Sequence, residues 1–241
     1  MQKRNILCVG DSLTRGGVGW SYVHFSEHRE CLRNEGVDGN TLWGLTQRLP
    51  LLLHSIRAES VCIIGIGTND TLLPHLATVR GWKTSMSVRS TKMHCIRDDS
   101  AFAHAYRNML NIVTNAGLTP VILGLPLTEM EDYPIAEHEA RNLLLRQIAA
   151  DDGHSFVDTA AAMRRAVASA ERTIRWSRTP IPRIIDAATM QTVPATKDMW
   201  AHHRQLNLTV DGVHWSSKTA KAVASEVDVA LRALKTKGTQ S

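Results

Sequence analysis

The sequence predicts an α/β fold in which a parallel sheet is covered by helices on both faces. Two patterns within its 241 residues carry this prediction. Short apolar runs alternate with amphipathic segments of helix length, as in repeated β–α units. The run over 61–66 is apolar throughout, as expected of a central parallel strand that is buried on both faces.

Taken in order along the chain, strands are expected over 5–9, 30–37, 61–66, 120–125 and 155–157. The periodicity predicts helices over 42–56, 101–116, 136–150, 160–170 and 216–234. The last helix has the clearest start, with Ser216 or Ser217 as its N-cap. Its predicted apolar face consists of Ala220, Val223, Ala224, Val227 and Leu231.

Two segments, 75–99 and 172–208, interrupt this alternation. They contain polar residues, prolines and scattered tryptophans without a clear period. We expect them to be irregular insertions of the kind that forms lids or binding loops in compact domains. No repeat, low-complexity tract or linker divides the chain, so we expect a single domain over 1–241 with insertions at about 75–99 and 172–208.

The composition is typical of a folded protein, with 43% hydrophobic and 21% charged residues. No apolar run approaches the ~18 residues that a membrane span needs. The apolar stretch after residue 4 is too short for a signal peptide, so a cytoplasmic location is expected. The four cysteines show no CxxC spacing, and we expect buried, reduced thiols.

The net charge of +5 is unevenly distributed, because two runs of the chain are strongly basic. The first contains Arg80, Lys83, Arg89, Lys92 and Arg97, and the second contains Arg164, Arg165, Arg172, Arg175, Arg178 and Arg183. These runs could face water, pack on a partner subunit, or attract an anionic substrate to a nearby cleft. No helix-turn-helix, zinc-finger or RNP-like pattern accompanies them, so no nucleic-acid partner is expected.

Four polar motifs lie after expected strands or just before the last helix. They are GDSL at 10–13, NEGVDGNT at 34–41, GTND at 67–70 and DGVH at 211–214. Ligands of an open parallel sheet bind beyond the carboxyl ends of its strands, near the point where the strand order reverses. We therefore expect the four motifs to meet at one edge of the sheet.

Together these motifs contain what ester hydrolysis requires. The hydroxyl of Ser12 needs a base to become a good nucleophile, and His214 is suited to that role near neutral pH. Asp211, three residues before it, can hold the imidazole and stabilise its charged form. The tetrahedral intermediate needs hydrogen-bond donors, which the N–H groups of Ser12 and Gly39 and the side-chain amide of Asn69 could supply.

The four motifs resemble, in the same order, the four sequence blocks of the GDSL/SGNH hydrolases. The resemblance spans nearly the whole chain and implies that family's flavodoxin-like fold, a three-layer α/β/α sandwich with a five-stranded parallel sheet. It implies that Ser12 is the nucleophile, that Gly39 and Asn69 complete the oxyanion hole, and that Asp211 orients the base His214. The sequence contains no set of metal ligands, so no metal is expected, and no cofactor is expected either. The two insertions are larger and more basic than a minimal member of the family needs, so the resemblance does not identify the substrate.

Other residues near the motifs have alternative roles. His202 and His203 are adjacent but have no carboxylate or thiol set nearby, so we expect no metal site there. Asp11 and Asp70 are expected to organise their loops as hydrogen-bond acceptors. Trp43 and Trp215 follow the second and fourth motifs. Each could form a wall of the substrate pocket or pack in the core.

The sequence therefore predicts a serine hydrolase that cleaves carboxylic esters, as an esterase, an O-deacylase or a lysophospholipase-like enzyme. Its substrate would be a small-molecule, acylated-carbohydrate or lipid ester, anionic if the basic insertions overhang the cleft. An acyltransferase would use the same residues, and a non-catalytic binding module could share the scaffold. A flavodoxin-type nucleotide binder is disfavoured, because Asp11 would repel a phosphate at the first loop.

Overall fold

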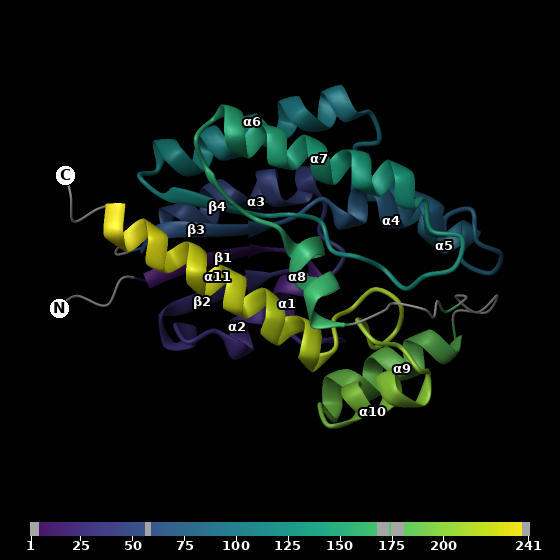
Figure 1. Cartoon of the computed structure of the whole chain (residues 1–241). Coiled ribbons are helices and arrows are strands. Elements are labelled where there is room, and N and C mark those ends of the chain that lie inside the picture. Colours follow the sequence, from purple (N-terminus) through teal and green to yellow (C-terminus); the bar gives the residue numbers. More distant parts are fainter. Residues whose placement is uncertain (1–4, 56–58, 168–173, 175–180, 238–241) are drawn as a thin grey trace.

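The computed structural model describes residues 5–55, 59–167, 174 and 181–237. Its centre is a five-stranded parallel sheet with the strand order β2-β1-β3-β4-β5, flanked by helices on both faces (Figure 1). The strands are β1 (Asn5–Gly10), β2 (Leu32–Gly36), β3 (Glu59–Gly65), β4 (Thr119–Leu123) and β5 (Ser155–Val157). The predicted α/β/α sandwich with five parallel strands is confirmed.

Helices α3 (Leu42–His54), α6 (Asp99–Asn115) and α7 (Ile135–Asp151) cover one face of the sheet. The other face is covered by α2 (Tyr22–Phe25), α8 (Thr159–Ala166) and α11 (Ser217–Lys237). The remaining helices are α1 (Ser12–Arg15), the 3-10 turn η1 (Arg29–Cys31), α4 (Thr68–Leu76), α5 (Lys83–Lys92), α9 (Ile181–Thr192) and α10 (Thr196–His203). None of the described helices is both long enough and apolar enough to cross a membrane.

Successive side chains of the central strands alternate between the two helical layers. In β1, Leu7 and Val9 pack with α3, α6 and α7, whereas Ile6 and Cys8 pack with α2, α8 and α11. This two-residue period is that of a strand buried on both faces. The predicted face of α11 is buried as expected, and Ser216 occupies the N-cap position, where its hydroxyl accepts a hydrogen bond from the N–H of Thr219 at 3.4 Å.

The two insertions are largely helical, so the expectation of irregular structure was wrong. The segment 75–99 forms α5, and the described part of 172–208 forms α9 and α10. Each of these helices buries few residues, such as Trp82 and Met86 of the first insertion and Met190 of α9. Short helices are stabilised by tertiary packing more than by a long apolar stripe. This explains why the sequence of the two insertions shows no clear helical periodicity. Residues 168–173 and 175–180 lie outside the described part of the chain.

Three glycines form a row across the carboxyl ends of adjacent strands. Gly10 of β1 is aligned with Gly36 of β2 on one side and with Gly65 of β3 on the other. A Cβ atom on Gly36 would lie 2.2 Å from the backbone nitrogen of Arg15, and one on Gly10 would lie 2.3 Å from the carbonyl oxygen of Gly65. The row therefore allows α1 to lie directly on the strand ends, which places Ser12 at the reversal of strand order.

Candidate active site

Ser12 is the first residue of α1, immediately beyond the end of β1. The carboxylate of Asp11 caps this helix by accepting a hydrogen bond from the N–H of Leu13 at 2.9 Å. Gly16 ends the helix in the left-handed conformation, with φ = 76°. Because Asp11 caps one end of this single helical turn and Gly16 the other, the backbone conformation around Ser12 is fixed.

His214 lies between Ser12 and Asp211. Its Nε2 is 3.0 Å from the Ser12 hydroxyl oxygen, and its Nδ1 is 2.8 Å from Asp211 Oδ2. The other oxygen of Asp211, Oδ1, accepts hydrogen bonds from the N–H groups of Val213 at 3.0 Å and His214 at 2.8 Å. Oδ1 of Asp211 thus holds the backbone turn over 211–214, while Oδ2 binds the imidazole ring of His214. The three-residue spacing allows both contacts.

The charge of Asp211 changes the protonation of His214. Burial acts to lower the pKa of His214, but the charge and hydrogen bond of Asp211 outweigh it, and the pKa is raised above its ordinary value. Burial acts to raise the pKa of Asp211, but the charge and hydrogen bonds of His214 prevail and lower it to about 2. The pair therefore stabilises an imidazolium beside an ionised carboxylate.

Gly39 and Asn69 lie beyond the ends of β2 and β3, the two strands that flank β1. Gly39 has φ = 72°, a conformation that favours glycine. The side-chain nitrogen of Asn69 donates to the carbonyl oxygen of Asn40 at 2.9 Å, which joins the two loops. Within the described residues, the N–H groups of Ser12 and Gly39 form no hydrogen bond. Both N–H groups are therefore available to a substrate oxygen.

A cleft of about 250 Å³ connects the five predicted residues Ser12, Gly39, Asn69, Asp211 and His214. One wall is apolar and comes from α4 and the first insertion, with Leu72, Leu73, Leu76, Trp82 and Met86. The rest of the lining comes from Val18, Asp38, Arg89, Arg183, Ile184 and Ala187. The cleft thus combines a candidate nucleophile, a candidate base and candidate hydrogen-bond donors with an apolar surface.

The basic insertions contribute one arginine each to this cleft. Arg89 comes from α5 and Arg183 from α9. The other basic residues of the first insertion, Arg80, Lys83, Lys92 and Arg97, do not line it. Arg172, Arg175 and Arg178 lie outside the described residues. His202 and His203 are exposed at the end of α10 and belong to no group of metal-ligand spacing among the described residues.

Asp11 and Asp70 are buried and accept hydrogen bonds from the backbone of their surroundings, as predicted. Asp70 accepts from the N–H groups of Leu42 at 3.0 Å and Ile96 at 2.9 Å, so it links the start of α3 to the end of the first insertion. Burial raises the pKa of Asp11 to about 7 and that of Asp70 to about 6. Neither residue lines the cleft.

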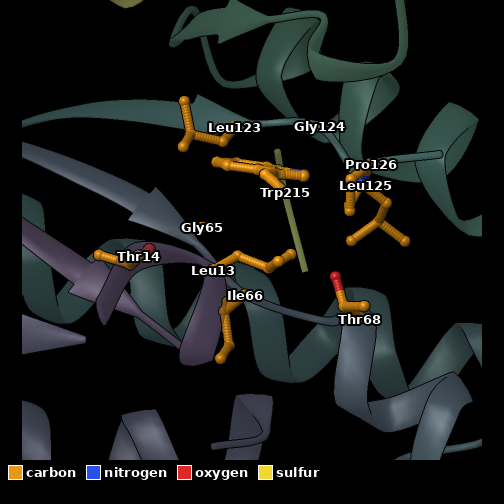
Figure 2. Close-up of a pocket in the computed structure, with 10 residues that line it drawn as sticks. All are labelled: Leu13, Thr14, Gly65, Ile66, Thr68, Leu123, Gly124, Leu125, Pro126 and Trp215. Carbon is orange, nitrogen blue, oxygen red and sulfur yellow. The ribbon is translucent and has the colours of Figure 1, made fainter. Parts of the chain in front are cut away.

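The structure places neither Trp43 nor Trp215 in the lining of this cleft. Trp215 is 2% exposed and packs behind α1 against Leu13 and Leu123, beside a cavity of about 10 Å³ that is barely large enough for one water molecule (Figure 2). Trp43 is 39% exposed and stacks on His94, with their ring centroids 4.1 Å apart. Trp215 therefore packs in the core and does not form a wall of this cleft, whereas Trp43 lies at the surface.

One buried acid beside the site was not singled out from the sequence. Glu129 lies in the loop between β4 and α7, and its carboxylate accepts hydrogen bonds from the N–H groups of Asn207, Leu208 and Thr209 at 2.9, 3.1 and 2.9 Å. The N–H of Glu129 donates to the carbonyl oxygen of Gly212 at 2.8 Å. No local sequence signal indicates this role, because its partners are about 80 residues away along the chain.

Comparison with known proteins gives one family and a set of similar folds. The family model described as "GDSL-like Lipase/Acylhydrolase family" matches residues 8–176, which include Ser12, Gly39 and Asn69. Asp211 and His214 lie beyond the match, and the structure brings them to Ser12. No curated protein sequence matches the chain.

Several solved structures share the fold at low sequence identity. A GDSL-like lipase from Bacteroides thetaiotaomicron has a TM-score of 0.62 at 12% identity, over 97% of this chain and 90% of that one. A lipase/acylhydrolase from Enterococcus faecalis has a TM-score of 0.59 at 14% identity, over 95% and 96%. An acetylxylan esterase from Geobacillus stearothermophilus has a TM-score of 0.54 at 18% identity, over 96% and 94%. At these identities the likeness concerns the fold.

Proposed function

Because the chain belongs to the GDSL-like lipase/acylhydrolase family, we propose that it hydrolyses carboxylic esters through an acyl-enzyme formed on Ser12. The observation that carries this proposal is the unbroken hydrogen-bond chain from Asp211 through His214 to the Ser12 hydroxyl, with links of 2.8 and 3.0 Å. Such a chain activates a serine hydroxyl, which is otherwise a poor nucleophile.

In the proposed reaction, Ser12 Oγ attacks the ester carbonyl carbon while His214 Nε2 takes the hydroxyl proton. The N–H groups of Ser12 and Gly39 and the amide of Asn69 donate to the oxygen that becomes negative. Asp211 stabilises the imidazolium, which then gives its proton to the departing alcohol. A water molecule attacks the acyl group, His214 takes the proton of that water, and collapse of the second intermediate releases the acid and restores Ser12.

The apolar wall formed by α4 and the first insertion supports an ester with an apolar acyl group longer than acetyl. Leu73 and Leu76 of α4 and Met86 of α5 line the cleft that contains Ser12. Burial of an acyl chain there would contribute about 0.8 kcal/mol for each methylene group. The acetylxylan esterases among the similar folds support an acetylated carbohydrate as the alternative substrate.

Hydrolysis is favoured over acyl transfer by the access of water to the reacting groups. Ser12 is partly exposed, and the side chain of His214 is 15% exposed. An acyltransferase has to protect its acyl-enzyme from water, which requires a more enclosed site. A non-catalytic binding module would have no use for the hydrogen-bonded arrangement of Asp211, His214 and Ser12.

The test is labelling with a fluorophosphonate, followed by turnover of p-nitrophenyl esters. We expect the wild-type protein and Ser100→Ala, which alters an exposed serine of α6, to be labelled and active. Ser12→Ala should not be labelled, and its kcat should fall by on the order of 10⁴–10⁶. A folded Ser12→Ala protein that keeps substantial turnover would refute the nucleophile assignment. If an alcohol added to the wild-type reaction diverts most of the product to a new ester, acyl transfer is favoured over hydrolysis.

A further inference from the structure

Helix α9 of the second insertion exposes apolar residues and turns its charged residues inward. Ile181, Ile184 and Ile185 are 66%, 61% and 59% exposed, and their spacing places them on one face of the helix. The side chains of Arg183 and Asp186 are only 9% and 17% exposed. A surface helix ordinarily has the reverse arrangement, so the outward face of α9 is suited to contact with something other than water.

The inward charges fix the rotation of α9 about its own axis. Arg183 Nη1 lies 4.0 Å from Asp186 Oδ2. Arg204 binds the same carboxylate and donates to the carbonyl oxygen of Val210 at 2.8 Å. Val210 directly precedes Asp211, so these contacts attach α9 to the segment that carries two of the predicted site residues. The isoleucines cannot turn into the protein unless this network of ion pairs breaks.

The apolar face of α9 borders the cleft that contains Ser12. Ile184 lines this cleft together with Arg89 of α5, so both insertions contribute to its rim. Figure 1 shows α5 and α9 on the same side of the molecule. Ile181 and Ile185 do not line the cleft. The apolar face therefore continues from the rim of the cleft onto the outer surface of the protein.

Helix α5 adds positive charge beside the same cleft. Its basic residues Lys83, Arg89 and Lys92 are exposed, and the helix has no acidic residue. None of the three forms an ion pair with another described residue. The same helix exposes an aliphatic side chain, Val88, which is 64% exposed. The two insertions therefore surround the cleft with exposed aliphatic side chains and with cations that no described carboxylate neutralises.

This combination favours a lipid surface with anionic headgroups over other occupants. Aliphatic side chains enter the boundary between headgroups and acyl chains, while lysine and arginine bind the anionic headgroups. A second copy of the chain fits less well, because a two-fold interface places the same patch against itself and brings like charges together. The acyl chain of a dissolved ester would contact only the residues inside the cleft, which leaves Ile181 and Ile185 without a role.

We propose that α9 and α5 dock the protein on an anionic lipid surface. The three isoleucines of α9 enter the headgroup boundary, and the three cations of α5 bind the headgroups. The rim of the cleft then lies against the lipid, so an ester held in the lipid layer can reach Ser12 directly. Docking goes beyond the proposed function, because it requires no reaction at Ser12.

The test measures sedimentation of the protein with vesicles of phosphatidylcholine alone and of phosphatidylcholine mixed with phosphatidylglycerol. Ser12→Ala is measured beside the wild type, which separates binding from any hydrolysis of the lipid. We expect both proteins to bind the mixed vesicles about tenfold or more tightly than the neutral vesicles. Added salt should reduce this difference, because it screens the attraction between the cations of α5 and the headgroups.

Two double variants separate the apolar and the charged part of the docking surface. Ile181→Gln with Ile185→Gln should weaken binding to the mixed vesicles by about tenfold or more, because less apolar surface enters the lipid. Lys83→Gln with Lys92→Gln should weaken it by a similar factor, because fewer cations meet the headgroups. All four residues are exposed, so the melting temperature should stay at the wild-type value and verify the fold.

Matched controls alter the same kinds of residue elsewhere on the surface. Leu51→Gln changes a side chain that is 79% exposed near the end of α3, the helix that leads back to the start of β3 at the opposite edge of the sheet. Arg29→Gln with Lys221→Gln removes as many charges as the α5 variant, from η1 and α11. Both controls should bind the mixed vesicles as the wild type does.

The proposal is overturned if the wild-type protein does not bind the mixed vesicles, or if the isoleucine variant binds them as tightly as the wild type. An equal loss in the charge control would show that net charge, and not α5, attracts the lipid. A wild-type dimer that the isoleucine variant converts to a monomer, measured by light scattering, would assign the face to a second copy of the chain. Failure of the proposed ester hydrolysis is distinguishable, because binding is also measured with Ser12→Ala.

Discussion

The carboxylate of Glu129 accepts hydrogen bonds from both the backbone N–H and the hydroxyl of Thr209, at 2.9 and 2.7 Å. Thr209 lies two residues before Asp211, and its hydroxyl oxygen accepts a hydrogen bond from the N–H of Gly212 at 3.0 Å. Glu129 is 1% exposed. A buried acid from the loop after β4 therefore holds the turn that carries Asp211 and His214.

Glu129→Gln should weaken this turn, because the amide NH₂ would face backbone N–H donors and cannot accept their hydrogen bonds. We expect a loss of about 2 kcal/mol or more in the free energy of unfolding, measured by urea denaturation. In the fraction that is folded, kcat should fall while KM changes little, because the base is misplaced and the apolar wall is intact.

The matched control for Glu129→Gln is Glu139→Gln, which alters an exposed residue of α7 whose carboxylate is 3.5 Å from Arg164. This control should change neither stability nor kcat noticeably. A Glu129→Gln protein with wild-type kcat and stability would show that the turn needs no such support.

Asn69→Ala should lower kcat by roughly 10²–10³ with little change in KM. The amide is expected to bind the oxygen more strongly when it becomes negative than in the ground state. The same change also removes the hydrogen bond to Asn40, so the melting temperature should be measured in parallel. An effect confined to KM would instead assign Asn69 to substrate binding.

The pH dependence of kcat/KM should follow the ionisation of His214. Because the charge of Asp211 raises the pKa of His214, activity should increase with pH through a midpoint above about 6.5, the ordinary value for histidine. Titration of the His214 ring signals by NMR gives the same pKa independently. A midpoint well below the ordinary value would contradict this electrostatic account.

Asp211→Asn removes the charge that opposes the effect of burial on His214. The pKa of His214 should then fall, so that the midpoint of the remaining activity moves to lower pH. The kcat should fall by on the order of 10⁴, because the ring loses the carboxylate that fixes its tautomer. A midpoint that stays at the wild-type pH in a folded Asp211→Asn protein would show that another group titrates.

The length of the acyl chain should affect turnover through the apolar wall of the cleft. From acetate to butyrate, kcat/KM for p-nitrophenyl esters should rise by about fourfold for each added methylene group. Met86→Trp should fill part of this space and reduce the preference for the longer chain, whereas Leu143→Trp, at an exposed site of α7, should not. A preference for acetate in the wild type would favour the acetylated-carbohydrate alternative.

The sequence by itself determined the sheet and the neighbourhood of the predicted site residues. The apolar runs predicted the five strands, and the motifs that follow β1, β2 and β3 had to meet because carboxyl ends of parallel strands share one edge. The three-residue spacing of Asp211 and His214 is likewise a local signal, since both lie on one turn. Roles at these positions remain predictions that the variants above can test.

Only the tertiary structure decided which other residues join that edge. Arg89 and Arg183 are two among many basic residues of the insertions, and their common cleft depends on how α5 and α9 pack. Glu129 is matched to Thr209 by contacts across about 80 residues. Trp215 follows His214 in the chain but packs in the core, because neighbouring side chains point in different directions. Such long-range packing leaves no periodic trace in the sequence, whereas strands and local turns do.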